Sequence, residues 1–477
     1  MLDWKKVSVK RLATVVIASL LLSSSQVAAS GVDVSSYQKI EEVKQIIDQY
    51  HLEQVEEKDI IDDAIDGIVN GLDDPYASYY SQKDAEQITQ LFEEGYVDSG
   101  LVLHDDLDGN VIVIDTLENS ASDGKLELGD IITKIDVEDI TAYGAVYAAY
   151  WLSGSDGDEI TVTVLRNGEE REIKLTLTPY DFSSIESTMI HDIGYIKMKQ
   201  FSEDADESFK QHLDRLKEQG MEKLVFDLRN NPGGFVDTAM NIVKNFMDKA
   251  VVMYTTDASG ITIPATIIDG KNADFPVVIL VNEESASASE LLTGALQDHE
   301  VATVVGNWTY GKARIQQYFP LSDGSVFGLT IQHYLTPNKR DINYIGLLPD
   351  VYVYEEIPQF ITALHTAGVK QMELKRTPYG VEVNGHDLQA TFNMVENEGT
   401  IYIPYTILGA LMNAEIVYDY EKETVQFIQG EQSTIYDMNS EVFQAYNETY
   451  FIDVAVVQQT FPQLQWSNKD GELHLKY

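Results

Sequence analysis

Apolar residues recur at helical spacing along the first part of the chain. The pattern predicts a helical region over residues 30–95, in two runs. The segment 72–76 contains Pro75, which interrupts the pattern because proline cannot continue a helix. Such a region is expected to pack on a neighbouring domain or on a second copy of the chain, as in a homodimer formed through these helices. The apolar positions are Ile40, Val43, Ile46, Ile47 and Tyr50 in the first run, and Ile60, Ile61, Ala64, Ile65, Ile68 and Val69 in the second.

The hydrophobic period changes to two between residues 96 and 180. Apolar stretches at 111–114, 160–165 and 173–177 are each bounded by Gly, Asp or Asn. Short apolar runs between turn residues predict β-strands. A short helix is expected between Tyr143 and Leu152. The segment is therefore predicted to be a small β-domain.

Strand and helix patterns alternate over residues 181–368. One buried strand, at 224–228, leads directly into the sequence RNNPGG, and another, at 277–281, leads into a turn rich in Ser and Ala. The alternation predicts a mostly parallel sheet with helices packed outside it. In such sheets ligand chemistry gathers at the carboxyl ends of the strands, which is where both turns fall.

Residues 369–477 carry short strand patterns rich in Tyr, Asn and Glu. They contain a weak internal repeat, in which 400–425 corresponds to 449–473 with an offset of 48 to 49 residues. A small α+β domain is expected here. Its only histidines are His386 and His474 and it has no cysteine, so no metal site is expected.

Length and charge limit the possible functions. A chain of 477 residues is too long for one core and suggests about three domains. With 33 basic and 78 acidic residues, its net charge of -45 argues against nucleic acid and anionic membrane surfaces as partners, because both would repel it. The absence of cysteine excludes disulfides and a lipid-modified N-terminal cysteine.

The N-terminus has the pattern of an export signal. Four basic residues within the first eleven precede an apolar run at 12–22 and the small residues Ala28 and Ala29. This pattern predicts a signal peptide over residues 1–29. The protein is expected outside the cell or between membrane and cell wall, and it would be membrane-anchored if the signal were not cleaved.

The turn after residue 281 could carry a nucleophile. A helix that begins near residues 285–289 leaves backbone N–H groups free at its positive end. A serine hydroxyl there could attack a carbonyl whose developing oxyanion those donors hold. Ser287-Ala288-Ser289-Glu290 is also a capping-box pattern, so a purely structural turn is the alternative.

Lys312 is the best candidate for the base, because the chain has no Gly-x-Ser-x-Gly elbow and no histidine in a recognisable triad context. Lysine must be neutral to accept a proton, so burial has to lower its pKa by several units from about 10.4. Gln316 follows four residues later. In a strand the two residues would be about 13 Å apart, so a hydrogen bond between them predicts a helical turn here.

Together these motifs resemble the carboxyl-terminal processing peptidases, also called tail-specific serine proteases. The resemblance covers about residues 35–355 and rests on SASASE, the Tyr-Gly-Lys that ends at Lys312, RNNPGG, DDPY at 73–76, YLTP at 334–337 and GLLPD at 346–350. It implies a crotonase/Clp-like α/β protease core in a multidomain α/β protein. It also implies the nucleophile Ser287, the base Lys312, the orienting Gln316, and an oxyanion hole from N–H groups near Gly233 and Ala288. Ala313 departs from the family, which commonly has glycine there.

Residues 96–180 resemble a circularly permuted bacterial PDZ domain. The resemblance rests on a glycine followed by three apolar residues, then LGDII, a short helix and TVTVLRNG. It implies that one loop cradles the carboxylate of a peptide's C-terminus. That loop comprises Ser99, Gly100, Leu101, Val102 and Leu103. The acidic segment 104–109 does not fit a calcium loop, so a hairpin turn is expected there.

The C-terminal region resembles the stalk-like domain at the N-terminus of copper amine oxidases and would act as a spacer or bind the cell wall or a protein. The whole chain is therefore expected to be an exported serine endopeptidase that needs no cofactor and acts on proteins or peptides with free C-termini. The alternatives are a catalytically silent PDZ-containing scaffold and, from the core's likeness to crotonases, an enoyl-hydratase-type enzyme. The chain has no recognisable coenzyme A site to support the latter.

Overall fold

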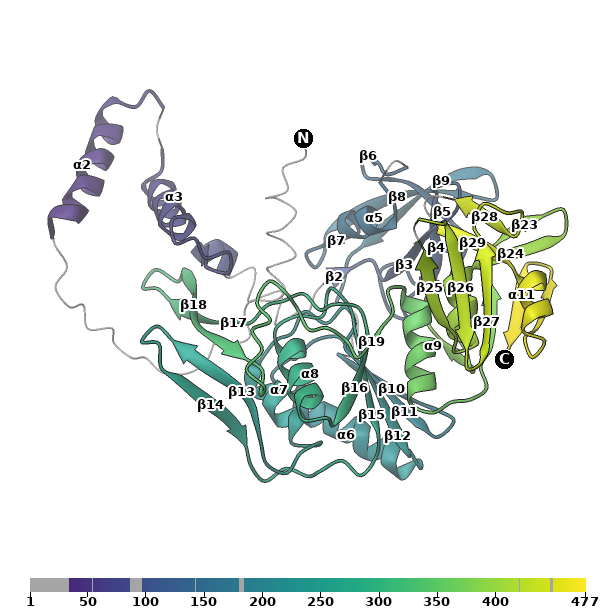
Figure 1. Ribbon diagram of the computed structural model, residues 1–477. Helices are drawn as coiled ribbons and strands as arrows, with labels where there is room; N and C mark the ends of the chain where they lie inside the picture. The colour runs from purple at the N-terminus through teal and green to yellow at the C-terminus, as the bar shows by residue number, and fades with distance from the viewer. Residues whose placement is uncertain are drawn as a thin grey trace.

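The computed structural model describes residues 34–53, 55–85, 97–141, 143–179, 184–419, 421–446 and 449–477. The predicted signal peptide lies outside the described residues. Figure 1 shows the α/β core at the centre, with the PDZ-like domain and the C-terminal domain together on one side and two N-terminal helices on the other.

A six-stranded sheet forms the centre of the core, in the order β10-β11-β12-β15-β16-β19. Neighbouring strands are parallel except for β10, which pairs with β11 in antiparallel fashion. The mostly parallel sheet predicted from the sequence is therefore confirmed. The strands are β10 (Ile185–Ile190), β11 (Ile193–Met198), β12 (Lys223–Asp227), β15 (Val277–Val281), β16 (Ala302–Gly306) and β19 (Val351–Tyr352).

Helices cover both faces of this sheet, so its central strands are apolar on both sides. Helices α6 (Ala205–Glu218), α7 (Val236–Val243) and α8 (Ala288–Asp298) pack on one face and α9 (Glu356–Thr366) on the other. Within β15, Ile279 belongs to the cluster around α6, α7 and α8, while Val278 and Leu280 belong to the cluster around α9. The alternation explains why every residue of β15 is buried.

A second, antiparallel sheet was not predicted from the sequence. Its path is β1-β18-β13-β14, and β17 also pairs with β18. Strand β1 comes from the N-terminal region directly after the proline break, so this region is tied into the core. The strands are β1 (Ser78–Tyr80), β13 (Ala250–Asp257), β14 (Thr262–Ile267), β17 (Arg314–Pro320) and β18 (Val326–Leu335).

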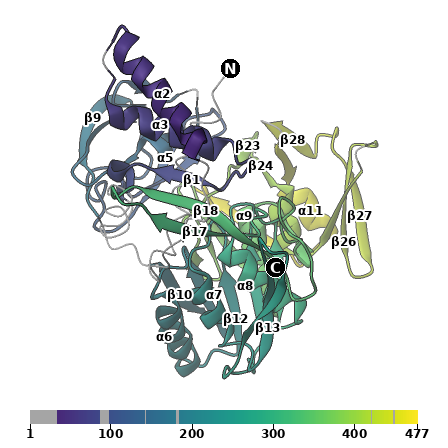
Figure 2. The ribbon, with the colours of Figure 1, turned by 90° about the vertical axis from the view of Figure 1, so that its left-hand side faces the viewer.

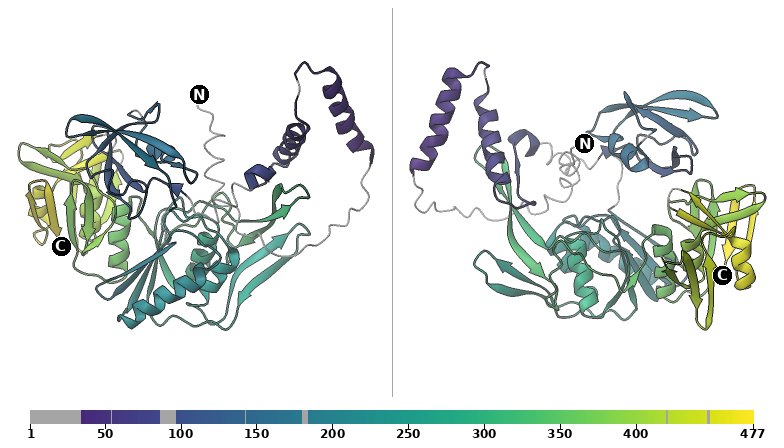
Figure 3. Two further views of the ribbon diagram at one scale, coloured as in Figure 1. Left: turned by 180° about the vertical axis from the view of Figure 1, so that it is seen from behind. Right: turned by 45° about the horizontal axis from the view of Figure 1, so that its top comes forward.

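The predicted N-terminal helices are α2 (Val34–Tyr50) and α3 (Glu57–Asn70). They project away from the rest of the chain as a pair, as Figures 1 and 3 show. Several large apolar side chains stay exposed on them, including Ile46 at 58% and Tyr50 at 73%. Among the helices that the structure describes, none is long and apolar enough to cross a membrane.

The PDZ-like domain has its own hydrophobic cluster, built from strands β3, β4, β5, β8 and β9 and helix α5. The segment after β3 forms a hairpin turn in which Asp106 N donates to Asn110 O at 3.0 Å, so the hairpin prediction is confirmed. The elements are β2 (Val97–Asp98), β3 (Leu101–Asp105), β4 (Val111–Thr116), β5 (Ile131–Ile135), β6 (Glu138–Asp139), α5 (Ala145–Trp151), β7 (Ser153–Gly154), β8 (Glu159–Arg166) and β9 (Glu169–Thr176).

The C-terminal region shows the predicted repeat as two strand–helix–strand–strand units. The first unit is β24 (Thr400–Pro404), α10 (Tyr405–Leu411), β25 (Glu415–Asp419) and β26 (Thr424–Gln429). The second is β29 (Thr449–Asp453), α11 (Val454–Thr460), β30 (Gln465–Lys469) and β31 (Glu472–Lys476). Figure 2 shows β26 and β27 extending together at one side of this region. The remaining strands are β20 (Glu373–Thr377), β21 (Gly380–Val383), β22 (His386–Asp387), β23 (Val395–Asn397), β27 (Gln432–Asp437) and β28 (Phe443–Tyr446).

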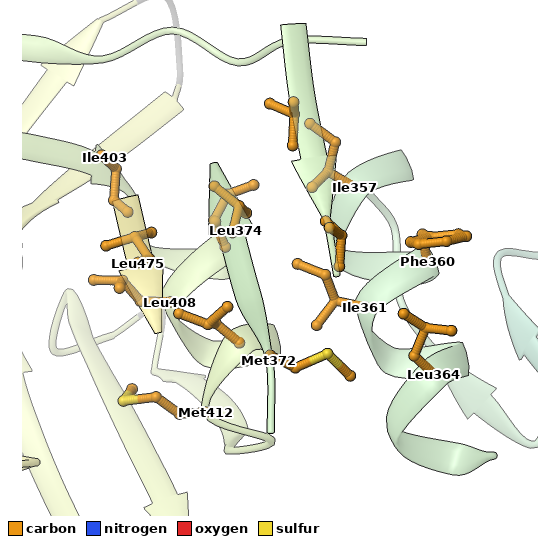
Figure 4. Packing of buried hydrophobic residues seen from close by; sticks show 14 of the residues in the cluster. Ile357, Phe360, Ile361, Leu364, Met372, Leu374, Ile403, Leu408, Met412 and Leu475 are labelled. Carbon is orange, nitrogen blue, oxygen red and sulfur yellow. The ribbon is translucent and has the colours of Figure 1, made fainter. Parts of the chain in front are cut away.

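Helix α9 joins the C-terminal region to the core through one continuous hydrophobic cluster. Its residues Phe360 and Ile361 are fully buried, and the cluster runs from β15 and β16 through α9 to Leu374, Leu408 and beyond. Figure 4 shows the side chains of α9 facing those of β20, α10 and β31. The C-terminal region thus completes the covering of α9, in addition to any binding role.

Ending the chain after Gly368 should therefore prevent stable folding. The truncation would expose the apolar side of α9 that the C-terminal region covers, and large exposed apolar patches promote aggregation. Replacing residues 97–179 with a short Gly/Ser linker is the matched control, because their cluster is separate from that of the core. We expect aggregation or a strongly lowered Tm for the truncation and a smaller change for the control, measured by scanning fluorimetry. A truncated chain with the Tm of the full chain would show that the shared cluster does not matter.

Candidate active site

Ser287 lies between β15 and α8, at the N-cap of the helix, as the sequence predicted. Its backbone has φ 55° and ψ -111°, a conformation that is rare for a residue with a side chain. Two neighbouring serines fix this turn to the loop after β12. The hydroxyl of Ser285 donates to Leu228 O at 2.8 Å and that of Ser289 donates to Asn231 O at 2.9 Å. The surroundings therefore hold a strained residue at a helix start, which is common at functional sites.

The buried carboxylate of Glu290 connects the serine turn to the lysine loop. Its Oε2 accepts from the N–H of Ser287 at 3.0 Å and from the N–H of Lys312 at 2.7 Å. Its Oε1 accepts from Gly311 N at 2.7 Å and from the Thr309 hydroxyl at 2.5 Å. Burial raises the pKa of Glu290, and these four donors oppose that effect by stabilising the charged form. One carboxylate thus brings the backbones of Ser287 and Lys312 together.

Lys312 is buried, with only 2% of its surface exposed. Burial lowers the pKa of its amine to about 8, while the charge of Glu290 acts in the opposite direction. The ring of Tyr76 lies over the amine, with the Nζ atom 5.3 Å from the ring centroid. The hydroxyl of Tyr334 lies 3.2 Å from Ser287 O and 3.3 Å from Lys312 O, a second bridge between the two segments. A lysine in these surroundings can lose its proton near neutral pH.

The helical turn expected between Lys312 and Gln316 is not formed. Residues 311–313 are irregular, and Gln316 lies in β17 directly after a β-bulge. Its amide Nε2 donates to Arg314 O at 3.1 Å. The prediction of a turn was wrong because β17 pairs with β18, and that long-range pairing cannot be read from the local sequence. The orienting role of Gln316 stays a prediction.

Gly233 and Ala288 lie next to Ser287. A Cβ atom on Gly233 would be 2.8 Å from Ser287 Cβ and 2.9 Å from Ala288 N, so only glycine fits there. Ala288 is the first residue of α8, where backbone N–H groups lack intrahelical acceptors. The N–H of Gly233 donates to the Asn231 side chain at 2.9 Å, so it is engaged in this conformation. Its use as an oxyanion donor requires that this bond be exchanged.

The RNNPGG loop is held from behind by a buried ion pair. Arg229 Nη2 donates to Asp227 Oδ2 at 2.6 Å, and Tyr195 donates to the same oxygen at 2.7 Å. Burial acts to raise the pKa of Asp227, but the charge and hydrogen bonds of Arg229 hold it below its usual value. Arg229 also donates to Glu356 O at 2.8 Å, at the start of α9.

The predicted carboxylate loop of the PDZ-like domain precedes and enters β3. Gly100 has φ +70° and lies against Ser120, and Ser99 is buried. The N–H of Gly100 donates to the carboxylate of Asp98 at 2.6 Å, and that of Ser99 donates to Leu152 O at 2.9 Å. The Asp98 carboxylate therefore closes a local turn at the start of this loop. Leu101, Val102 and Leu103 form the first part of β3 and pair with β4.

Sequence reasoning missed the central position of Glu290 and the covering position of Tyr76. The signals were present, since Glu290 is the last residue of the capping-box pattern and Tyr76 ends the DDPY motif. Within the described ranges, no group of three or more His, Cys, Asp or Glu residues could hold a metal ion.

Comparisons with known proteins agree with these observations. Residues 192–353 match peptidase family S41, residues 100–177 match a PDZ domain, and residues 11–84 match the N-terminal domain of the activating protease CtpB. None of these three matches reaches the C-terminal region, so its likeness to the stalk-like domain is not confirmed.

Individual relatives are similar over most of their length. The chain is 32% identical to the carboxyl-terminal-processing protease of Picosynechococcus sp., covering 62% of this chain and 73% of that one. It is 29% identical to the "Probable CtpA-like serine protease" of Staphylococcus saprophyticus, covering 74% of both. Among solved structures, the photosystem II D1 C-terminal processing protease is 26% identical with a TM-score of 0.47, covering 68% of this chain and 88% of that one.

Replacing Glu290 with Gln should disrupt the site. The amide keeps the shape of the side chain but turns an NH₂ group towards backbone N–H donors. Hydrogen bonds to charged groups contribute about 1.5–3 kcal/mol each, so we expect a loss of at least about 2 kcal/mol of stability. Labelling of Ser287 by a fluorophosphonate should slow strongly.

Glu300→Gln is the matched control, because Glu300 is exposed just beyond the other end of α8. Urea unfolding and labelling rates compare the two variants. Equal stabilities and equal labelling rates for Glu290→Gln and Glu300→Gln would contradict a central role for Glu290.

Proposed function

Because this chain belongs to the carboxyl-terminal-processing serine proteases of peptidase family S41, we propose that Ser287 is its nucleophile and Lys312 its general base. The chain is a serine peptidase that contains a PDZ domain, and its substrates are proteins or peptides. The single observation that carries the assignment is the shared carboxylate of Glu290, which binds the N–H groups of both residues. Chemistry agrees with it, because the lysine amine has a pKa of about 8.

The reaction follows from these roles. Neutral Lys312 takes the proton from the Ser287 hydroxyl while the Ser287 oxygen attacks the carbonyl carbon of the substrate. The resulting ammonium gives that proton to the leaving amine when the peptide bond breaks, which leaves an acyl-enzyme and neutral lysine. A water molecule then attacks the ester and passes a proton to the amine, and the proton returns to Ser287 when the new C-terminus leaves.

We assign the oxyanion hole to the backbone N–H groups of Ala288 and Gly233. The closeness of Gly233 to Ser287 supports this assignment, as does the position of Ala288 at the positive end of α8. In the conformation described, the Gly233 N–H binds Asn231. We infer that substrate binding exchanges this bond. We assign the orienting role to Gln316 from the family resemblance. In the conformation described its Nε2 donates to Arg314 O, so orienting Lys312 with this group requires that bond to be exchanged.

We propose that the PDZ domain captures the free C-terminus of the substrate. Its carboxylate would bind N–H groups of the loop formed by Ser99, Gly100, Leu101, Val102 and Leu103, and the tail would extend along the edge of β3. The match of residues 100–177 to a PDZ domain supports this role. The Gly100 N–H donates to the Asp98 side chain in a local turn, so a tail that used this donor would compete with Asp98.

The proposed enzyme is exported, has four regions after its signal peptide and forms a homodimer. We propose an exported enzyme whose signal comprises residues 1–29, followed by a helical region (30–95), a PDZ-like domain (96–180), a protease core (181–368) and an accessory domain (369–477). The exposed apolar residues of α2 support assembly into a homodimer, because an isolated apolar helix face in water is unfavourable. The accessory domain would bind the cell wall or a protein.

Ser287→Ala and Lys312→Ala should each reduce cleavage of an unstructured protein with an apolar C-terminus to background. Lys312→Arg should be equally inactive, because a guanidinium stays protonated and cannot accept the proton of Ser287. Only the neutral amine accepts a proton, so kcat/KM of the wild type should rise with pH through a pKa of about 8. Below that value it should change about tenfold per pH unit. Product formation by mass spectrometry measures both effects, and full activity of either alanine variant would exclude the pair.

Amidation of the substrate's terminal carboxylate tests capture by the PDZ domain. The amide removes charge-assisted hydrogen bonds, which are worth about 1.5–3 kcal/mol each, so we expect at least about a tenfold rise in KM. The rate at which a fluorophosphonate labels Ser287 is the control, since it needs no tail. Equal KM values for the free and the amidated substrate would show that the loop does not bind C-termini.

A further inference from the structure

The DDPY motif at residues 73–76 has no part in the chemistry described so far. Its tyrosine nevertheless lies at the active site, with its ring centroid 5.3 Å from the Nζ atom of Lys312. Tyr76 is itself buried, with 8% of its surface exposed. The ring also stacks on Tyr344, with centroids 6.4 Å apart. Tyr76 thus contacts both the buried lysine amine and a tyrosine that is 70% exposed to solvent.

The turn that carries Tyr76 is fixed to the core. The Asp74 carboxylate accepts from Tyr76 N at 3.0 Å and from the Thr330 hydroxyl of β18 at 3.2 Å. Directly after it, β1 pairs with β18 from Ser78 to Tyr80. Proline at position 75 limits the backbone of the turn further. The ring is therefore held over the lysine by residues on both sides of it in the sequence.

Two opposing effects of the ring act on the amine. Its negative face attracts the ammonium form, which favours protonation. Its bulk excludes water, which disfavours the charged form. The other charged or titratable groups around the amine and the ring are Glu290 on α8, Tyr334 on β18, Arg314 on β17, and Tyr310 and Tyr344 in the neighbouring loops. Burial lowers the pKa of Lys312 although the charge of Glu290 raises it, so exclusion of water outweighs that charge. The ring of Tyr76 is part of the surroundings that bury the amine.

We propose that Tyr76 is a positioning residue that shields the amine of Lys312 from water and so keeps it available as a base. The inference rests on the proposed role of Lys312 and assigns a function to the DDPY motif. Burial raises the pKa of the Tyr76 hydroxyl to about 12, so this group stays protonated near neutral pH. The size of the side chain is what matters.

A graded series of substitutions tests this proposal in the full-length protein. Tyr76→Phe and Tyr76→Leu keep a large apolar cover, while Tyr76→Val and Tyr76→Ala admit water progressively. The acid limb of the kcat/KM profile should stay near pH 8 for Phe and Leu. It should move up by at least about one pH unit for Ala, which means about tenfold less activity at pH 7 that returns at higher pH. KM should change little.

Direct titration of Lys312 provides a second measurement that does not depend on activity. Trace acetylation of the full-length protein between pH 6 and 11, followed by mass spectrometry, gives the pKa of this amine. The pKa of Lys312 should rise from the wild type to Tyr76→Val and again to Tyr76→Ala. The Tyr79→Ala variant is the matched control, because Tyr79 lies in the same segment and bonds Asp62 instead of facing the lysine. The pKa of Lys312 in Tyr79→Ala should match that in the wild type. If Tyr76→Ala fails to fold, the comparison of Tyr76→Val with the wild type still tests the proposal.

The outcomes separate this inference from the proposed function. An unchanged Lys312 titration in both Val and Ala would overturn the shielding role, and so would a Leu variant that behaves like Ala. Full activity of Lys312→Ala would instead exclude Lys312 as the general base. Titration of Lys312 in the wild type and in the Tyr76 variants would still decide whether Tyr76 shields the amine.

Discussion

The hydrogen bonds to the buried carboxylate of Glu290 are the interaction on which the proposed active site depends. Three backbone N–H groups and one hydroxyl from two separate segments converge on it. A buried charge without such donors would be strongly unfavourable, so the serine turn and the lysine loop are each needed to satisfy it. The same carboxylate favours the ammonium form of Lys312, and the burial of the amine has to overcome this. Two opposing effects therefore set the pKa of Lys312: the negative charge of Glu290 raises it, and the exclusion of water lowers it.

The RNNPGG loop connects this site to the far side of the core. Arg229 binds Asp227 and the start of α9, and Tyr195 donates to the same aspartate. His386 of the C-terminal region lies against Tyr195, with ring centroids 4.9 Å apart, and stacks on Phe360 of α9. The C-terminal region therefore supports the back of the loop that contains Gly233. Its packing contributes to the protease core, whatever else it binds.

The C-terminal region also contacts the PDZ domain. Asn393 donates to Asp105 O at 3.1 Å and lies 3.3 Å from the ring nitrogen Nε2 of His104. Leu107 of the PDZ hairpin packs on a small cluster that includes Phe451. In the arrangement of Figure 1 the PDZ domain thus rests on a part of the chain that is itself fixed to α9. The PDZ domain and the protease core are therefore connected through contacts that the sequence order does not reveal.

The sequence by itself determined the elements whose information is local. Apolar runs defined β12 and β15, helical spacing defined α2 and α3, and the motifs placed Ser287 and Lys312 in turns at the ends of strands. Tertiary structure decided everything that depends on partners distant in the chain. The pairing of β17 with β18 replaced the expected helical turn at Gln316, and the position of Tyr76 follows from the pairing of β1 with β18. Glu290 illustrates the difference, because its capping role was visible locally, whereas its bonds to Gly311 and Lys312 form only when two loops meet.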